Sequence, residues 1–290
     1  MTPAGPIRPV LDHVVVNVMT RLDEVAAQFT RLGFQLTARG HHSLGSSNHL
    51  AVFGEGYLEL LGFLPGNEGR RPDLVGHPAG LTGLAFKADD PAQVYAAMRA
   101  RGVPVREPMS FARPVAAPDG KTAEGMTAEA RFTVITMPPE VVANGRTFLC
   151  HHHTPELVWR PEWQTHRNGA RGIAEFVIAS HEPQRTAALY ETMFGPNLTA
   201  PVAGGLSFAA GAMTVLILTP ETVAARYRDA APVSPDGADR MVALAFAVTS
   251  LDSPRAVLDG EGVPYTALPS GGIVVPHDQA GNVALAFVER

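Results

Sequence analysis

Two side chains of types that commonly bind metal ions stand inside otherwise apolar segments of the chain. His13 lies within the run LDHVVV, and Glu59 lies within YLELLG. An imidazole or a carboxylate that is buried without a partner costs several kcal/mol, so each needs an ion or a hydrogen bond if it faces the core. The alternative is that each lies on the polar, solvent-facing side of an alternating strand.

Three consecutive histidines follow Cys150 in the segment RTFLCHHHTPEL. Successive side chains of a strand point to opposite faces, so Cys150 and His152 share one face, and His151 and His153 share the other. At most one of these faces can look into a site, and a solvated face is the alternative for the triplet. Pro155 ends the predicted strand.

The cysteine content limits which metal chemistry is open to the chain. It has 11 histidines but one cysteine, which excludes an internal disulfide and a zinc site made of several thiolates. A metal ion would have to be held by histidines and carboxylates. The chain contains no GxSxG elbow, no Walker P-loop and no HExxH pair.

Composition predicts a folded protein that does not bind nucleic acid. The 290 residues include 23 Lys and Arg against 28 Asp and Glu, a net charge of −5, with 46% apolar and 18% charged residues. Phosphate binding usually needs a basic excess, which is missing here. No apolar run is long enough for a membrane span, and the start MTPAGPIRPV has no signal-peptide core, so we expect a cytoplasmic protein without a membrane partner.

A unit of strand, helix, glycine and further strands recurs four times. The four glycines are Gly33, Gly102, Gly195 and Gly262, with spacings of 69, 93 and 67 residues. Each is followed by apolar segments of strand length, so each unit is predicted to be a βαβββ module. Short strands are also expected directly after the glycines, at FQLTA (34–38) and VPVRE (103–107).

The long middle spacing marks a boundary between two pairs of modules. It contains a segment rich in Pro, Trp and Arg, which is predicted to be a linker over residues 154–171. The predicted organisation is a first domain over 1–153 and a second over 172–290. The fold class is α+β, with four βαβββ modules paired into two domains.

The chain resembles the vicinal oxygen chelate superfamily of glyoxalases, extradiol dioxygenases, epimerases and bleomycin-resistance proteins. The segments LDHVVVNV, LGFQLTARGHHSLGSSNHLAVFGEGYLELLGF and HHHTPELVWRPEW are similar to the glyoxalase-like domain family. The resemblance implies that two modules curl into a half-barrel of eight strands. It also implies a divalent ion in the cup, held near the first and last strands of each module.

The resemblance implies His13, Glu59 and His152 as the metal ligands. Two imidazoles and one carboxylate suit Zn, Fe(II), Mn or Ni and leave coordination positions open for a substrate. Module two offers Gly83 where module one has His13. A register slip of one residue would make His151 or His153 the ligand instead of His152.

The second half offers no comparable set, and a loop offers pocket residues for the first. Glu175 and Ala243 stand at the first-strand positions, and Ile217 and Ala286 stand on the last strands, so this half is predicted to be metal-free and to brace the first. The loop over residues 40–50 and the linker supply the candidate substrate-pocket residues, which are His41, Asn48 and Trp159.

The leading expectation is a divalent-metal-dependent enzyme, a lyase or isomerase rather than a ring-cleaving dioxygenase, acting on a small oxygen-rich molecule. The alternative is a metal-free small-molecule binding or resistance protein of the same fold. The sequence identifies neither the substrate, the metal nor a general base, and it fits a monomer or a homodimer.

Overall fold

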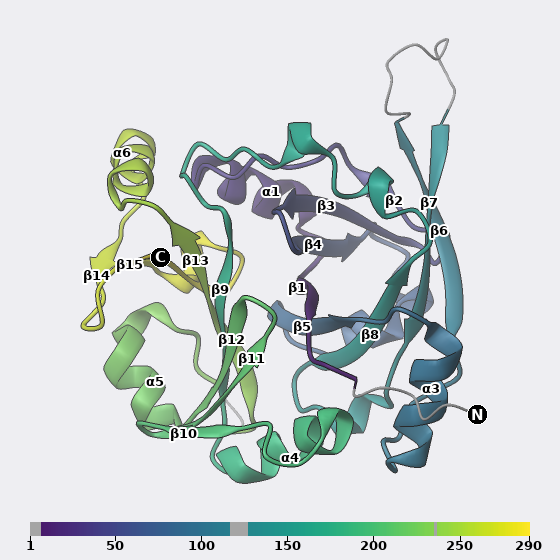
Figure 1. The fold of residues 1–290 in the computed structure, drawn as a ribbon. Coiled ribbons are helices and arrows are strands. Elements are labelled where there is room, and N and C mark those ends of the chain that lie inside the picture. The colour runs from purple at the N-terminus through teal and green to yellow at the C-terminus, as the bar shows by residue number, and fades with distance from the viewer. Residues whose placement is uncertain (1–6, 117–126, 235–236) are drawn as a thin grey trace.

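The computed structural model describes residues 7–116, 127–234 and 237–290, and its strands form two eight-stranded sheets. Figure 1 shows them side by side, the first in purple to teal and the second in green to yellow. The first sheet contains β1 (Leu11–Met19), β2 (Gly40–His41), β3 (Ser46–Val52), β4 (Tyr57–Phe63), β5 (Gly80–Lys87), β6 (Met109–Ala116), β7 (Thr127–Ile135) and β8 (Arg146–His152). The second contains β9 (Gly172–Ala179), β10 (Ala200–Val202), β11 (Gly205–Ala210), β12 (Met213–Leu218), β13 (Arg240–Val248), β14 (Thr266–Ala267), β15 (Ile273–Val275) and β16 (Ala284–Glu289).

The order of elements confirms the predicted α+β architecture of four βαβββ modules. The helices are α1 (Leu22–Arg31), α2 (Pro72–Val75), α3 (Pro91–Ala100), α4 (Pro183–Phe194), α5 (Pro220–Tyr227) and α6 (Asp252–Glu261). Helices α1, α3, α4 and α6 each follow the first strand of a module, whereas α2 and α5 connect one module to the next. Along the sequence, the strands of the first sheet precede the predicted linker over residues 154–171, and the strands of the second sheet follow it.

The strands expected directly after the first two helices are absent. Residues 34–38 and 103–107 have no strand structure, and the pairing begins later, at β2 and β6. Both segments are apolar enough to resemble strands, but Phe34, Val103 and Val105 contribute their side chains to the core from irregular backbone. The pattern therefore predicted burial correctly and pairing wrongly.

Each module's first strand carries one register irregularity at the same place. Where β1 runs antiparallel to β5, Leu11 faces Phe86 and His13 faces Ala85, so Asp12 is an extra, unpaired residue. The same interruption occurs at Thr82 in β5, Ala174 in β9 and Val242 in β13. The residues that follow these irregularities are His13, Gly83, Glu175 and Ala243, the four positions that the sequence repeat aligns.

The first sheet curls until its two edges meet. The loop after β2 reaches β6, and the amide of Ser43 donates to the carbonyl of Ala112 at 3.3 Å. The strand order, β2-β3-β4-β1-β5-β8-β7-β6, places β1 and β5 in the middle of the sheet. The inner surface of this sheet therefore surrounds a space, and alternate residues of β1 and β4 point into it.

Helix α5 covers the matching face of the second sheet. Its residues Val223 and Tyr227 form one buried cluster with Val177, Ala245 and other strand residues. Glu175, which we did not expect to bind a metal ion, forms ion pairs with Arg226 of α5 and with Arg290, the latter at 2.9 Å. This carboxylate thus serves to hold the helix and the C-terminal residue against the sheet.

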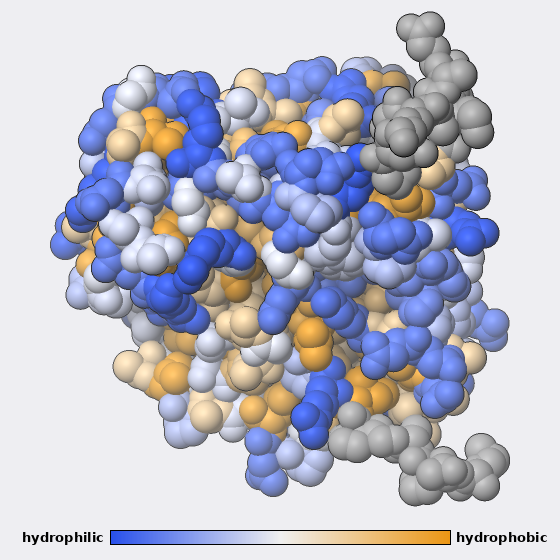
Figure 2. Space-filling view, turned by 45° about the horizontal axis from the view of Figure 1, so that its top comes forward, coloured by the Kyte–Doolittle hydropathy of each residue, from blue (hydrophilic) through white to orange (hydrophobic). Residues whose placement is uncertain are grey.

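The two halves share a continuous hydrophobic core. Phe34 of the first half lies 4.8 Å from the ring of Phe246 and 6.1 Å from that of Phe287, and Phe53 lies 5.5 Å from Phe246. On the face shown in Figure 2, hydrophobic residues occur in small patches among hydrophilic ones. Within the described residues, no helix combines the length and the apolar character that crossing a membrane requires.

Candidate metal and substrate site

The space inside the first sheet is a cavity of about 780 Å³. Its wall contains His13 of β1, Tyr57 and Glu59 of β4, and Asn48 of β3, four residues that share the inner face of the sheet. The wall also includes His42, Cys150, three phenylalanines and five arginines. A cavity of this size accommodates a small organic molecule.

His13 and Glu59 face each other across this cavity wall, as the sequence led us to expect of a ligand pair. Nε2 of His13 lies 3.9 Å from Oε2 of Glu59, and both side chains are more than nine-tenths buried. This separation is too long for a hydrogen bond. Two atoms bound to one ion at about 2.0 to 2.2 Å can lie up to about 4.4 Å apart, so the pair fits a shared metal ion.

Asp12 fixes the other side of the His13 ring. Its Oδ1 lies 2.5 Å from Nδ1 of His13 and accepts a second hydrogen bond from Nε2 of His152 at 3.0 Å. Burial raises the pKa of Asp12, but the hydrogen bonds from the two histidines outweigh it and hold that pKa well below its usual range. Asp12 is therefore ionised and orients His13 with Nε2 toward Glu59.

Glu59 is held from its far side by Asn48. The amide nitrogen of Asn48 donates to Oε1 of Glu59 at 2.6 Å and lies 3.3 Å from Nε2 of His42. His42 is a second imidazole near this carboxylate, with Nε2 at 3.8 Å from Oε1. Burial lowers the pKa of His42 to about 4, so its ring is neutral at pH 7 and can offer a lone pair.

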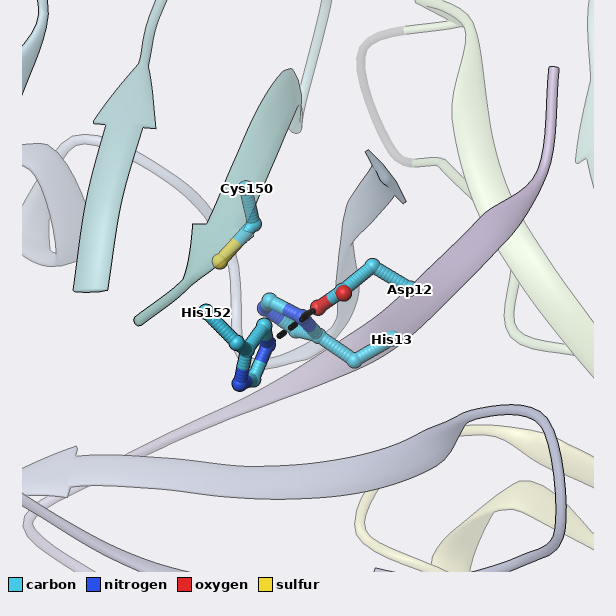
Figure 3. A group of neighbouring side chains, drawn as sticks. All are labelled: Asp12, His13, Cys150 and His152. Atoms are coloured by element: carbon cyan, nitrogen blue, oxygen red, sulfur yellow. Dashed lines mark hydrogen bonds and ion pairs between the residues drawn. The ribbon is translucent and has the colours of Figure 1, made fainter. Parts of the chain in front are cut away.

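Figure 3 shows His152 in a second cluster with Asp12, His13 and Cys150. The donor atoms of these four residues lie within 4.8 Å of one another, a group that does not include Glu59. Nδ1 of His152 is buried without a hydrogen-bond partner among the described residues. The structure thus brings His13 to Glu59 directly, whereas His152 reaches His13 through Asp12.

The strand register explains why His152 is set apart from Glu59. In module one, Glu59 of β4 pairs with Val15, two residues after His13. The matching residue of module two pairs with Ala85 and is Phe148, four residues before His152. In the second half the matching residues are Leu216 and Ala286, so Leu216 takes the position that the sequence analysis assigned to Ile217.

The other histidines of the triplet face away from the cavity. Nδ1 of His151 lies 2.7 Å from the carbonyl of Ala88, and Nε2 of His153 lies 2.8 Å from Oγ1 of Thr133. Both rings are satisfied on the opposite side of β8, which matches the alternation expected from the sequence. Cys150 lies near His152 and lines the cavity, whereas His152 is not among the residues of the cavity wall. Burial raises the pKa of the Cys150 thiol well above the usual value.

The three predicted pocket residues take different places. Asn48 lines the cavity, whereas His41 is exposed, with Nδ1 at 2.9 Å from Oγ of Ser47. His42, the next residue, turns its ring inward instead. Trp159 lies outside the cavity wall and packs on His152 at 4.7 Å between ring centroids, behind the metal-binding candidates.

Sequence reasoning missed Asp12, His42 and the cavity arginines. Asp12 should point away from His13 in a regular strand, and only the register irregularity turns both toward one another. His42 has the same residue type as its neighbour, so the sequence offered no reason to choose between them. The arginines come from three separate parts of the chain, at residues 70–71, 106–113 and 146, and no local pattern connects these parts.

The fold of this chain recurs in solved structures that align over nearly its whole length. A hypothetical protein from Staphylococcus aureus aligns over 97% of this chain and 99% of its own, with a TM-score of 0.67 and 11% identity. A mutant of 4-hydroxymandelate synthase from Streptomyces coelicolor aligns over 98% and 93%, with a TM-score of 0.57 and 13% identity.

A third structure, a xylose isomerase-like TIM barrel/4-hydroxyphenylpyruvate dioxygenase fusion protein, aligns over 99% of this chain at a TM-score of 0.56 and 13% identity. The chain spans 49% of that protein's length. No curated protein sequence matches significantly. The glyoxalase-like domain model matches residues 11–194, and the chain therefore belongs to the glyoxalase-like domain family.

Proposed function

We propose that the protein is a divalent-metal-dependent enzyme that acts on a small oxygen-rich molecule in the cavity of its first half. The observation that carries the proposal is the separation of 3.9 Å between Nε2 of His13 and Oε2 of Glu59. A nitrogen and an oxygen donor at this separation suit Zn, Fe(II), Mn or Ni. A bound ion would supply Lewis acidity to a substrate oxygen.

The third ligand position has two candidates. His152 is the one predicted from the sequence, and it approaches the site through its hydrogen bond to Asp12. His42 is the second imidazole near Glu59 and lies on the cavity wall. His13, Glu59 and His152 form the proposed set, and a variant at His42 decides whether that residue replaces His152.

The protein's own residues prepare the site for this role. Asp12 holds the ring of His13 in one orientation, and Asn48 does the same for the carboxylate of Glu59. The ring of Tyr57 stacks on His13 at 4.6 Å and limits access of water to that imidazole. These supports reduce the rearrangement that substrate binding requires.

Non-redox lyase or isomerase chemistry ranks above oxygenation. The names of two similar structures mention a dioxygenase and a synthase, but their identity to this chain is 13% in each case, so they support the fold and not the reaction. Cytoplasmic location and the oligomeric state stay predictions.

A metal-free binding protein of the same fold is the second candidate. This candidate is favoured by hydrogen bonds that already engage the polar groups of the site without an ion. Asp12 accepts from His13 and His152, and Asn48 donates to Glu59. In this case the cavity would sequester a ligand without changing it. The two candidates differ in whether His13 and Glu59 bind an ion.

The test is calorimetric titration of tag-free, chelator-treated protein with Zn²⁺, Mn²⁺, Ni²⁺ and, without oxygen, Fe²⁺. We expect one ion per chain, with affinity lowered at least tenfold by His13→Ala and by Glu59→Gln. His152→Ala and His42→Ala identify the third ligand. His181→Ala, at an exposed histidine of the second half, is the control and should bind as the wild type does. Equal affinity in all variants would overturn the proposal.

A further inference from the structure

The cavity of the first half has an electrostatic character opposite to that of the whole chain. The chain has a net charge of −5, yet the described residues of the cavity wall include five arginines and two carboxylates. The arginines are Arg70, Arg71, Arg106, Arg113 and Arg146, and the carboxylates are Glu59 and Asp73. The metal-binding proposal uses Glu59 and none of the arginines.

Arg113 of β6 is buried and forms no direct ion pair with any of the described residues. Its residue is 3% exposed, and Nη2 has no hydrogen-bond partner among the described residues. Burial lowers the pKa of Arg113, and nearby Tyr57 and Glu59 offset this only in part, although an arginine keeps its charge in proteins. A buried charge without a partner is costly, and one that points into a cavity is suited to a ligand of opposite charge.

The backbone makes room for this side chain at Gly40. A Cβ added there would lie 2.8 Å from Nη1 of Arg113 and 2.4 Å from Oδ1 of Asn48. These approaches are shorter than ordinary contacts, so only glycine leaves both side chains in place. Arg113 is therefore held next to the residue that supports Glu59.

The guanidinium of Arg146 of β8 is a second group with unused hydrogen-bond donors among the described residues. Its Nη1 donates to Asp73 at 2.6 Å, but Nε and Nη2 are buried without a partner among the described residues. Asp73 also accepts two hydrogen bonds from Arg71, at 2.8 and 2.9 Å. One carboxylate thus serves two guanidinium groups and leaves positive charge uncompensated.

The wall around these arginines is largely apolar and aromatic. Phe111 and Phe132 stack at 5.2 Å, and Phe148 lies beneath the guanidinium of Arg146 at 5.8 Å. Leucine, valine, methionine and proline side chains also line the cavity, with a smaller number of polar ones. A ligand that matches this surface has an apolar or aromatic body together with an anionic group.

We infer that the cavity binds a carboxylate with an apolar or aromatic body, and that the guanidinium of Arg113 or that of Arg146 binds its carboxylate group. The inference rests on the proposed function in taking this cavity as the substrate site, and it names the substrate class. The planar fork of a guanidinium matches the two oxygens of a carboxylate. Binding the anion at the arginines leaves the remaining oxygens of the molecule free to approach His13 and Glu59.

The test uses benzoate as the probe and benzamide, its neutral counterpart of similar shape, as the comparison. Binding is measured on the full chain by calorimetry and by thermal shift, with EDTA present throughout. We expect benzoate to raise the melting temperature and benzamide to have little effect. At least one of the variants Arg113→Met and Arg146→Met should weaken benzoate binding about tenfold or more, since charge-assisted hydrogen bonds are lost.

Two further variants separate binding from folding and from general charge. Arg99→Met removes an exposed arginine of α3 and should bind benzoate as the wild type does. Arg113→Met should be as stable as the wild type without ligand, or more stable, because an unpaired buried charge is removed; a residue with a structural role would destabilise the fold when lost. If Arg113→Met does not fold, Arg113→Lys, which keeps the positive charge, is used in its place. Its affinity for benzoate should be lower than that of the wild type but still measurable.

Equal binding of benzoate and benzamide by the wild type would overturn the inference. So would benzoate binding that survives both arginine substitutions. Because EDTA removes metal ions, these outcomes do not depend on the metal titration. A protein that binds benzoate but no ion would refute the proposed metal dependence alone, and the reverse result would refute the carboxylate inference alone.

Discussion

Oδ1 of Asp12 lies 2.5 Å from Nδ1 of His13, although the two residues are neighbours in one strand. Side chains of neighbouring strand residues normally point to opposite faces. The register irregularity at Asp12 removes this constraint, so the carboxylate can orient the imidazole that follows it. The strand itself therefore supplies both the metal-ligand candidate and its support.

Loss of this support should weaken metal binding without abolishing it. We expect Asp12→Asn to lower the affinity for the preferred ion by about 10- to 100-fold, as found for partners of metal-binding histidines. Calorimetric titration of the variant measures the change. Asp278→Asn, at an exposed aspartate, is the matched control. Wild-type affinity in Asp12→Asn, together with loss in His13→Ala, would show that Asp12 does not orient the ligand.

The aromatic cluster between the two halves should contribute strongly to stability. Phe246 is fully buried and contacts Phe34 and Phe53 of the other half. Phe246→Ala should lower the free energy of unfolding by about 3 to 5 kcal/mol, since it leaves a cavity in the core. Equilibrium urea denaturation measures it, with Val233→Ala, at an 81% exposed valine, as the control. A loss below about 1 kcal/mol would mean that the halves are stabilised separately.

His166 should make stability depend on pH. Its Nδ1 accepts from the amide of Gln35 and its Nε2 donates to the carbonyl of Val52, both at 3.0 Å, so the folded state requires a neutral ring. Burial lowers the pKa of His166, and the bond to Val52 offsets this only in part. Below about pH 6.5 the unfolded chain takes up a proton that the folded chain does not, so stability falls with decreasing pH.

The comparison of wild type with His166→Gln isolates this contribution from those of the other histidines. Melting temperatures recorded between pH 7.5 and pH 5.5 should fall further for the wild type than for the variant. Parallel curves would show that His166 is protonated equally in both states of the chain.

Cys150 should react slowly in the native protein. The residue is 3% exposed, and burial raises the pKa of its thiol well above the usual value, so little of the reactive thiolate forms at neutral pH. Ellman's reagent should label one thiol rapidly in urea and only slowly without it. A Val233→Cys variant supplies an exposed thiol for comparison, and equal native rates at both positions would contradict the burial of Cys150.

The sequence was sufficient for the architecture because its signals are local and repeated. Gly33, Gly102, Gly195 and Gly262 all have positive φ, a conformation that glycine adopts readily and that ends the module helices. The apolar runs between them identify most strands. The strands expected at 34–38 and 103–107 failed because apolar residues there are buried without pairing.

The site was only partly predictable. His13 and Glu59 were chosen because polar residues inside apolar strands need partners. The structure places them 3.9 Å apart, and their role as metal ligands stays a prediction. The choice of His152 depended on a family pattern, whereas the register of β8 against β5 is a tertiary property. Asp12, His42 and Arg113 were missed because a strand irregularity, a two-residue strand and the closure of the sheet bring them to the cavity.

The presence of α5 on the inner face of the second sheet limits how this protein could be redesigned or could diverge. Val223 and Tyr227 already occupy the volume that a guest molecule would need. Introducing histidines at Glu175 and Ala243 would therefore give donors with no room for a reactant. A second reaction chamber would require displacement of a whole helix, so new activities should arise more readily in the half that is already hollow.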